Sequence, residues 1–166
     1  MNQMQPIDMQ GLRVDQRDTQ THDQAPSTNS MSEFLIKRSG QRPLQFDGIE
    51  LCMAMSYIPN SEYWYEINVY RRSEQDFVLA IRIFFESVDE RDRVRAWECA
   101  TFDEVLKRLE NYDAAEDIRV EISADTTALS VPDLAAQSYF WRARATAARQ
   151  QFAGLVGEIL HELSSS

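Results

Sequence analysis

Residue types that support catalysis and cofactor binding are scarce in this chain of 166 residues. It has five glycines and two histidines, and no Walker loop, Gly-x-Gly-x-x-Gly or Gly-x-Ser-x-Gly sequence. Loops of these kinds need glycine, because it lets the backbone approach a phosphate closely or make the sharp turn that exposes a nucleophile. The sequence therefore predicts no catalytic residues and no cofactor.

Cysteine and long apolar runs are also lacking. Cys52 and Cys99 are the only cysteines, which is too few for a disulfide framework in a chain of this length. We expect both thiols to be reduced and the protein to be cytoplasmic. No apolar run has the length of a membrane span, and the first residues lack the basic and apolar regions of a secretory signal.

The formal net charge is −10. The acidic excess falls in residues 43–126, whereas residues 127–166 carry equal numbers of acidic and basic side chains. A strongly acidic chain repels DNA and anionic lipid. The charge therefore excludes indiscriminate binding to these polyanions and is compatible with a basic protein partner.

One sequence, Glu158-x-x-His161, has the spacing of a metal-binding pair on a helix. Carboxylate-bridged metal sites in helical bundles need two such motifs and further glutamates, and the other histidine is His22, near the start of the chain. We interpret His161 as a solvated residue near a helix end, where a histidine side chain interacts favourably with the helix dipole. No metal site is predicted.

Two further sets of residues have a chemical interpretation and a structural one. Cys52 and Cys99 would need a neighbouring histidine base to act as nucleophiles, and buried structural cysteines are far more common. Asp113, Glu116 and Asp117 form an acidic segment. We interpret this segment as a solvated loop, which is the usual role of such charge clusters.

Composition divides the chain into three parts. Residues 1–31 are rich in polar residues without periodicity, which predicts a disordered tail, with a short recognition peptide at residues 7–14 as an alternative. Residues 32–126 are predicted to form a domain of sheet and helix. Residues 127–166 are predicted to form a C-terminal helix that packs on this domain or serves oligomer or partner contacts.

Alternating apolar residues predict an antiparallel meander of four to five strands. The first expected strand is the short apolar run at residues 34–36. Asp47-Gly48 stands between two apolar segments, which favours a two-residue hairpin, and a longer strand with a bulge at Gly48 is the alternative. Further strands are expected at residues 49–57, 63–72, 77–86 and 93–99, with an edge strand at 118–122.

Two of these predicted strands have one face made of apolar residues. In residues 49–57 one face carries Ile49, Leu51, Met53, Met55 and Tyr57. In residues 77–86 one face carries Phe77, Leu79, Ile81, Ile83 and Phe85, the most regular period-two pattern in the chain.

Two helices are predicted. Thr101-x-x-Glu104 is a capping box, and apolar residues follow at helical spacing, so a short helix is expected at about 102–111. Ser130 and Asp133 can cap a long amphipathic helix at about 132–162. Such a helix would be about 45 Å long at 1.5 Å per residue, longer than a small sheet, so part of it is expected to project. The predicted fold class is α+β.

One sheet face is a candidate binding surface. If the short helix covers the aliphatic face, the other face combines aromatic rings with guanidinium groups, as a single-stranded nucleic-acid platform requires. The residues assigned to this face are Trp64, Tyr70, Arg72, Arg82, Phe84, Arg93, Arg95 and Trp97. The arrangement resembles Whirly and PUR-type nucleic-acid-binding domains at the level of the fold. The structural alternative is that the C-terminal helix covers this face.

The C-terminal helix is a second candidate binding surface. Trp141 is a large apolar anchor, and Arg142, Arg144 and Arg149 flank its stripe. A helix of this kind can form a homodimer or lie in the groove of a partner protein. The sequence therefore favours a non-catalytic protein-binding module, such as an accessory subunit, an adaptor or an immunity-type neutraliser. A single-stranded nucleic-acid-binding protein is the alternative, and an enzyme of unrecognised type is the second alternative.

Overall fold

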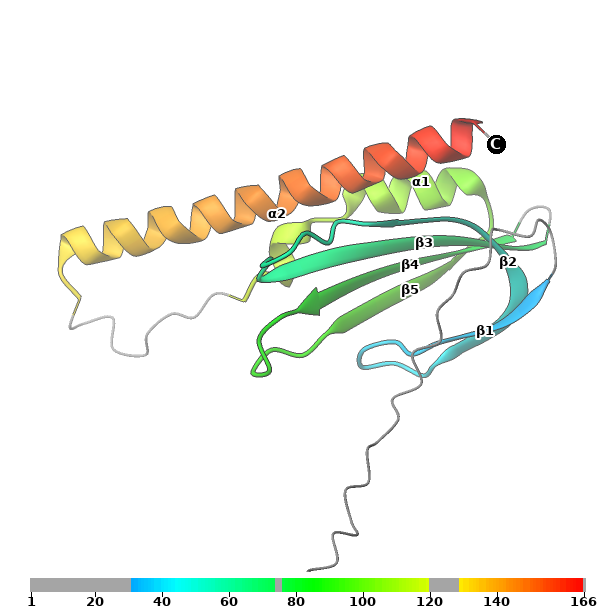
Figure 1. Cartoon of the computed structure of the whole chain (residues 1–166), viewed down its shortest axis with the longest axis horizontal. Helices are drawn as coiled ribbons and strands as arrows, with labels where there is room; N and C mark the ends of the chain where they lie inside the picture. The colour runs from blue at the N-terminus through cyan, green and yellow to red at the C-terminus, as the bar shows by residue number, and fades with distance from the viewer. Residues whose placement is uncertain (1–30, 74–75, 120–128, 166) are drawn as a thin grey trace, which may run out of the picture.

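The computed structural model describes residues 31–73, 76–119 and 129–165. Five strands form one antiparallel sheet in the order β1-β2-β3-β4-β5 (Figure 1). The predicted α+β class with an antiparallel meander is confirmed. The strands are β1 (Ser32–Ile36), β2 (Leu44–Met55), β3 (Tyr63–Ser73), β4 (Asp76–Phe85) and β5 (Arg93–Cys99).

Strand β2 runs continuously through Asp47 and Gly48, so the predicted hairpin is wrong and the longer strand is confirmed. Its first part pairs with β1 as far as Gly48, and its second part pairs with β3 from Ile49 onward. A Cβ at Gly48 would lie 2.8 Å from the carbonyl oxygen of Arg71. Glycine is therefore required here for a close approach between two strands, and not for a turn.

The irregularity in β2 lies between Glu50 and Cys52, and not at Gly48. Such a bulge reverses which side chains face each side of the sheet. It places Cys52 and Ala54 in the core and leaves Met53 and Met55 exposed. The predicted apolar stripe of residues 49–57 is consequently divided, and its second half is not a core face.

Three helical segments lie on one face of the sheet, which we call the helix-covered face. They are α1 (Phe102–Asn111), the 3-10 helix η1 (Ala114–Asp117) and α2 (Val131–Ser165). The predicted capping box begins α1: Glu104 N–H donates to Thr101 Oγ1 at 3.3 Å, and Ala100 N–H donates to Glu104 Oε2 at 2.8 Å. The core beneath these segments includes Tyr65, Ile67, Leu79, Ile81, Val105, Phe152, Leu155 and Ile159.

The opposite side of the sheet, which we call the second face, is partly covered by the β1–β2 hairpin. Ile36, Leu44 and Phe46 of this hairpin form a smaller core with Tyr70 and Val78. The expectation that the C-terminal helix covers the second face is therefore wrong. It fails because residues 148–159 of α2 complete the same core as α1.

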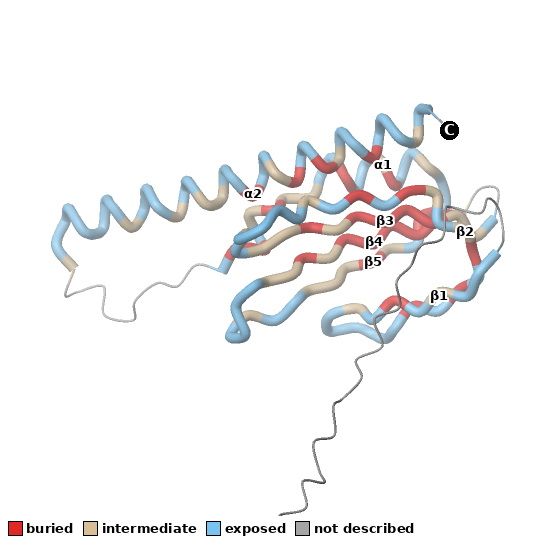
Figure 2. The backbone as a smooth tube through the Cα atoms, in the orientation of Figure 1, coloured by how far each residue is buried: buried red, intermediate tan, exposed pale blue. Residues whose placement is uncertain are grey.

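The second half of α2 packs on the sheet, and the first half contacts only the end of the sheet, through Trp141 and Arg144. Its buried residues begin at Ala148, and the preceding turns project beyond the strands (Figures 1 and 2). We call residues 131–147 the arm. The helix continues through Gly154 and Gly157 without a break. Of the predicted edge strand at 118–122, Ile118 instead is the C-cap of η1, and residues 120–122 lie outside the described residues. Residues 1–30 of the predicted tail also lie outside them.

Candidate functional site

Trp64, Tyr70, Arg72, Arg82 and Phe84 lie on the second face, as predicted. Trp64 stacks on Phe84 with ring centroids 5.5 Å apart. The Tyr70 ring is buried against Phe34 and Phe46 of the β1–β2 hairpin, at 4.6 and 5.5 Å. Tyr70 is thus part of the smaller core, and Trp64 and Phe84 are the half-exposed aromatic residues of this group.

The arginines of the second face are neutralised by carboxylates. Arg82 forms an ion pair with Glu66 and donates to Asn68 Oδ1 at 3.1 Å. Arg72 pairs with Asp76 and, at 2.5 Å, with Glu98. These guanidinium groups have donors committed within the protein, so they offer a phosphate backbone little net positive charge.

Arg95 and Trp97 lie on the helix-covered face, so the prediction that they share a face with Trp64 is wrong. Trp97 pairs with Leu79 and Arg95 with Ile81 across the β4–β5 ladder. Side chains of directly opposed residues point to the same side of a sheet. Arg93, opposite Ile83, belongs there too. The predicted aromatic and arginine platform is therefore divided between two faces.

Asp117 is fully buried, which corrects its interpretation as part of a solvated loop. Its Oδ2 accepts hydrogen bonds from the hydroxyls of Tyr112, at 2.5 Å, and Tyr65, at 3.3 Å. Its Oδ1 lies 3.1 Å from the Arg95 guanidinium and accepts no hydrogen bond. This cluster joins η1 to β3 and β5 and positions Arg95.

The same cluster perturbs its two phenols. Burial, with the Asp117 charge next, raises the pKa of Tyr65, and burial with the hydrogen bond to Asp117 raises the pKa of Tyr112. Both phenols remain protonated donors at neutral pH. The Asp117 carboxylate makes its contacts to two phenols and a guanidinium within the fold, which is typical of a structural network.

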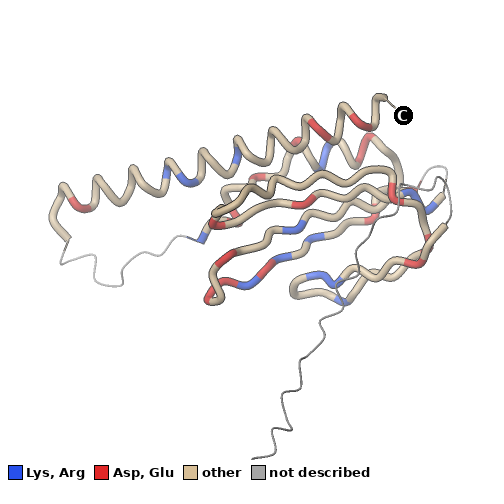
Figure 3. Tube along the Cα trace, viewed as in Figure 1, with Lys and Arg blue, Asp and Glu red and all other residues tan. Residues whose placement is uncertain are grey.

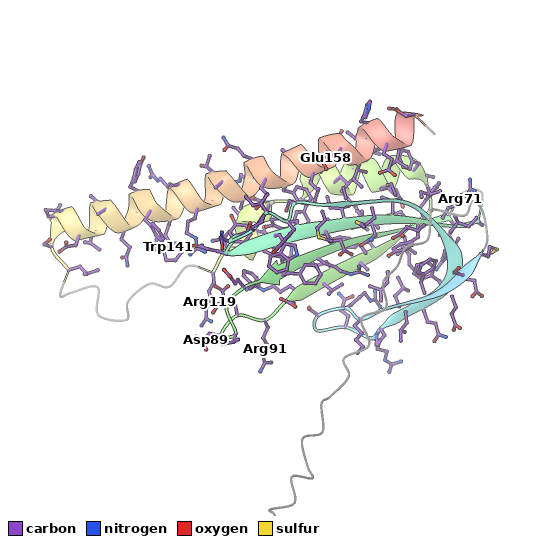
Figure 4. The ribbon with its side chains drawn as sticks, in the orientation of Figure 1. Arg71, Asp89, Arg91, Arg119, Trp141 and Glu158 are labelled. Atoms are coloured by element: carbon purple, nitrogen blue, oxygen red, sulfur yellow. The ribbon has the colours of Figure 1, made fainter. Side chains whose placement is uncertain are left out.

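Along α2, the predicted binding residues have three different environments. Arg149 makes two hydrogen bonds to Asp113, at 2.7 and 2.8 Å, and thereby fixes the helix to η1. Trp141 packs at the edge of the main core, between α2 and the end of the sheet (Figure 4). Arg142 is exposed and forms no ion pair among the described residues.

The arm exposes large apolar side chains. Val131 is 80% exposed, Tyr139 77% and Phe140 52%, and Leu134 is also exposed. Phe140 contacts Trp141 at 5.2 Å between ring centroids, and the Arg144 guanidinium lies over both rings. An apolar helix surface of this kind, with no partner in the described chain, is typical of a protein-binding surface.

Both cysteines are buried free thiols. Burial, with the Glu162 charge next, raises the pKa of Cys52 to about 12, and burial raises the pKa of Cys99. Thiols held in the protonated form are poor nucleophiles.

Within the described ranges there is no group of three or more His, Cys, Asp or Glu residues suited to a metal. In the same ranges, no helix combines the length and apolar character that a membrane span requires.

Sequence reasoning missed the contribution of α1 to a cavity of mixed charge beside β5. Lys107 and Arg108 of this helix line a cavity of about 370 Å³ together with Arg95, Trp97 and Tyr112 and with the carboxylates of Asp113 and Glu116. The Arg108 guanidinium lies 5.4 Å from the Trp97 ring centroid. Helical spacing placed Lys107 and Arg108 on the polar side of α1, but only the β5 register shows that Trp97 lies beside them.

Comparison of the chain with protein-family models, curated proteins and solved structures gives no match.

Proposed function

We propose that this protein is a non-catalytic protein-binding module, of the kind that serves as an accessory subunit, adaptor or neutraliser, and that the arm of α2 is its main contact surface. The observation that carries this proposal is the change along α2 from buried to exposed apolar residues. Phe152, Leu155 and Ile159 are buried, whereas Val131, Leu134 and Tyr139 belong to the same helix and are exposed.

The spacing of the arm residues supports a helical or groove-shaped partner. Leu134, Ser138, Trp141 and Ala145 continue, at alternating intervals of four and three residues, the stripe that Ala148 and Phe152 bury against the sheet. This spacing suits packing against another helix or in an apolar groove. Arg144 is already paired with Glu62 at 2.9 Å, so Arg142 is the cation that the arm offers to a partner. A partner groove with an acidic rim beside Arg142 fits it best.

Support for the two alternatives is weaker. A single-stranded nucleic-acid surface requires rings and unneutralised cations on one face, and here Arg72 and Arg82 are paired with carboxylates while Trp97 and Trp64 lie on opposite faces. For an enzyme, the buried thiols with raised pKa and the Asp117 carboxylate, which is paired with Arg95 and bonded by two phenols, offer no activated group.

Two variants of the full chain test the proposal. Leu134→Glu places a charge on the apolar stripe, and Ala143→Glu places the same charge on an exposed arm position outside it. We expect wild-type protein to sediment as a complex, either with itself or with a protein recovered stoichiometrically by affinity purification from the native cell. Leu134→Glu should abolish this complex, and Ala143→Glu should retain it.

Two results would contradict the proposal. One is a wild-type chain that sediments as a monomer and recovers no stoichiometric protein. The other is a complex that survives Leu134→Glu unchanged.

A further inference from the structure

Part of the second face has no covering layer in the described chain. The β1–β2 hairpin lies on the side of the sheet away from α2 (Figure 1) and covers the region around Tyr70 and Val78. Toward the start of β3 this cover ends. We call the remaining region the open part of the second face, and its apolar residues are Met53, Met55, Tyr57, Trp64 and Phe84.

The open part of the second face is a continuous apolar surface. Tyr57 is 54% exposed and meets the edge of Trp64 at 5.1 Å between ring centroids, and Trp64 stacks in turn on Phe84. Met53 and Met55 are exposed beside these rings. An apolar sheet face is stabilised when another layer of structure removes it from water, so this region lacks a layer.

The arm has the form of the missing layer. Residues Ala148 to Ile159 of α2 pack on the helix-covered face of the sheet, and the arm continues the same stripe through Trp141 to Leu134. The spacing that seats the second half of α2 on a sheet is therefore repeated in turns that project beyond the strands. An arm from a second copy of the chain can supply the layer that the open part lacks.

The end of the sheet beside the open part carries carboxylates without partners. A cavity of about 370 Å³ there is lined by Glu62, Glu86, Ser87, Glu90 and Arg144. Glu62 is paired with Arg144, whereas Glu86 is exposed and forms no ion pair among the described residues. Glu90 also lines a second cavity, which contains arginines of the β4–β5 turn (Figure 3). Glu86 is thus the carboxylate that this end offers to a partner.

The arm offers the complementary charge. Arg142 is exposed and forms no ion pair in the described part of the chain. Complementary charges beside two apolar surfaces favour the matched partner and fix its orientation. The same chain therefore presents an apolar helix with a free cation and an apolar sheet face with a free carboxylate.

We propose that the arm of one copy of this chain lies on the open part of the second face of another copy, with Arg142 beside Glu86. This inference rests on the proposed function and names its partner as a second copy. The two contacting surfaces differ, so the contact is heterologous. It forms reciprocally in a dimer or repeats in a longer oligomer.

Sedimentation velocity of the full chain over a range of concentrations tests the contact. We expect wild-type protein to self-associate, and Leu134→Glu in the arm and Tyr57→Lys in the open part each to weaken association by about tenfold or more, which is about 1.4 kcal/mol. Leu35→Lys is the matched control, because Leu35 is 60% exposed on β1, outside both surfaces. It should associate like the wild type.

An equimolar mixture of Leu134→Glu and Tyr57→Lys separates a head-to-tail contact from every other kind. The first variant keeps an intact open part and the second keeps an intact arm. The mixture should therefore form a complex with one copy of each, although neither variant self-associates. A variant that had lost its fold could not take part in this complex, so the mixture also controls for folding.

The ion pair is tested by exchanging its charges. Arg142→Glu and Glu86→Arg should each weaken self-association by about threefold, as expected for an exposed pair. Their equimolar mixture should regain it, because the altered arm then meets the altered sheet face. Absence of this recovery would contradict the placement of Arg142 beside Glu86.

Three results would overturn the inference. They are a wild-type chain that is monomeric at every concentration, self-association that Tyr57→Lys leaves unchanged, and a mixture of Leu134→Glu with Tyr57→Lys that stays unassociated. A monomeric wild type that recovers a different protein through its intact arm would overturn this inference and leave the proposed function standing. A monomer that recovers no protein would overturn both.

Discussion

The hydroxyl of Tyr112 donates a 2.5 Å hydrogen bond to the carboxylate of Asp117, which no solvent reaches. Tyr112 follows α1 and Asp117 ends η1, so this bond closes the connection between the two helical segments. The same carboxylate also receives the Tyr65 hydroxyl and lies against Arg95. One buried anion thus holds groups from two strands and a loop.

Asp117→Ala is expected to destabilise the protein by about 1–3 kcal/mol, because it leaves the Arg95 guanidinium without its counter-ion and the Tyr112 phenol without its acceptor. The Tyr65 hydroxyl keeps a second acceptor, the carbonyl oxygen of Ala114 at 3.0 Å. Glu116→Ala, at the neighbouring carboxylate of η1, should change the free energy of unfolding by about 0.5 kcal/mol or less. Urea unfolding followed by circular dichroism measures both. Equal effects of the two substitutions would show that the buried cluster has no special structural role.

The pKa of Tyr65 and of Tyr112 is raised by burial in the folded protein, so the protein should lose stability in alkali. An unfolded tyrosine ionises near pH 10. Stability from these phenols is fully present below about pH 10 and declines above it, since only the unfolded chain releases the protons. Urea unfolding at pH 8 and pH 11 should show the decline. The decline in the free energy of unfolding should be smaller in Tyr112→Phe, which lacks one of the two phenols. An identical decline in that variant would show that ionisation of Tyr112 is not its cause.

Cys52 and Cys99 should resist thiol reagents in the folded protein at pH 8. Cys52, with a pKa of about 12, is almost entirely protonated there, and both side chains are buried. Reaction with a chromogenic disulfide should be slow in buffer and should reach two thiols per chain in urea. Rapid reaction of one thiol without denaturant would indicate an accessible and activated cysteine, and would revive the enzyme alternative.

Gly48→Ala should destabilise the protein markedly, although alanine normally suits a strand better than glycine. The new Cβ would meet the carbonyl oxygen of Arg71, a backbone atom that can move only if β3 moves. Gly154→Ala provides the control, because its added Cβ meets nothing within 4 Å and α2 is helical there. It should stabilise by up to about 1 kcal/mol. Thermal unfolding distinguishes the two substitutions, because the midpoint temperature should fall for Gly48→Ala and rise for Gly154→Ala.

Local sequence patterns predicted the elements that depend on local physics. The alternation from Phe77 to Phe85 gave β4 and its core face, and the capping box at Thr101 gave the bounds of α1. Neither depends on the distant parts of the chain. The amphipathic stripe from Ala148 to Ile159 likewise predicted a long helix, and its excess length over the sheet predicted an arm.

Features that depend on the pairing of distant segments were not predictable in this way. The face on which Trp97 lies is set by the conformation of the β4–β5 turn, which fixes its partner as Leu79. Asp47-Gly48 has the composition of a turn, but it lies within a strand because β1 and β3 pair with either side of it. Asp117 resembles its solvated neighbours in sequence, and its burial follows only from the approach of Tyr65 and Arg95.

The unbroken course of α2 has a consequence for how the arm keeps its shape. A segment of 17 residues would be only marginally helical alone in water, because nucleation of a helix is costly. Here the docked turns from Ala148 onward act as the nucleus, and the arm propagates from them, so fraying should increase toward Val131. Amide protection should therefore decline from Ala148 to Val131 in the isolated chain and become uniform when the arm is occupied.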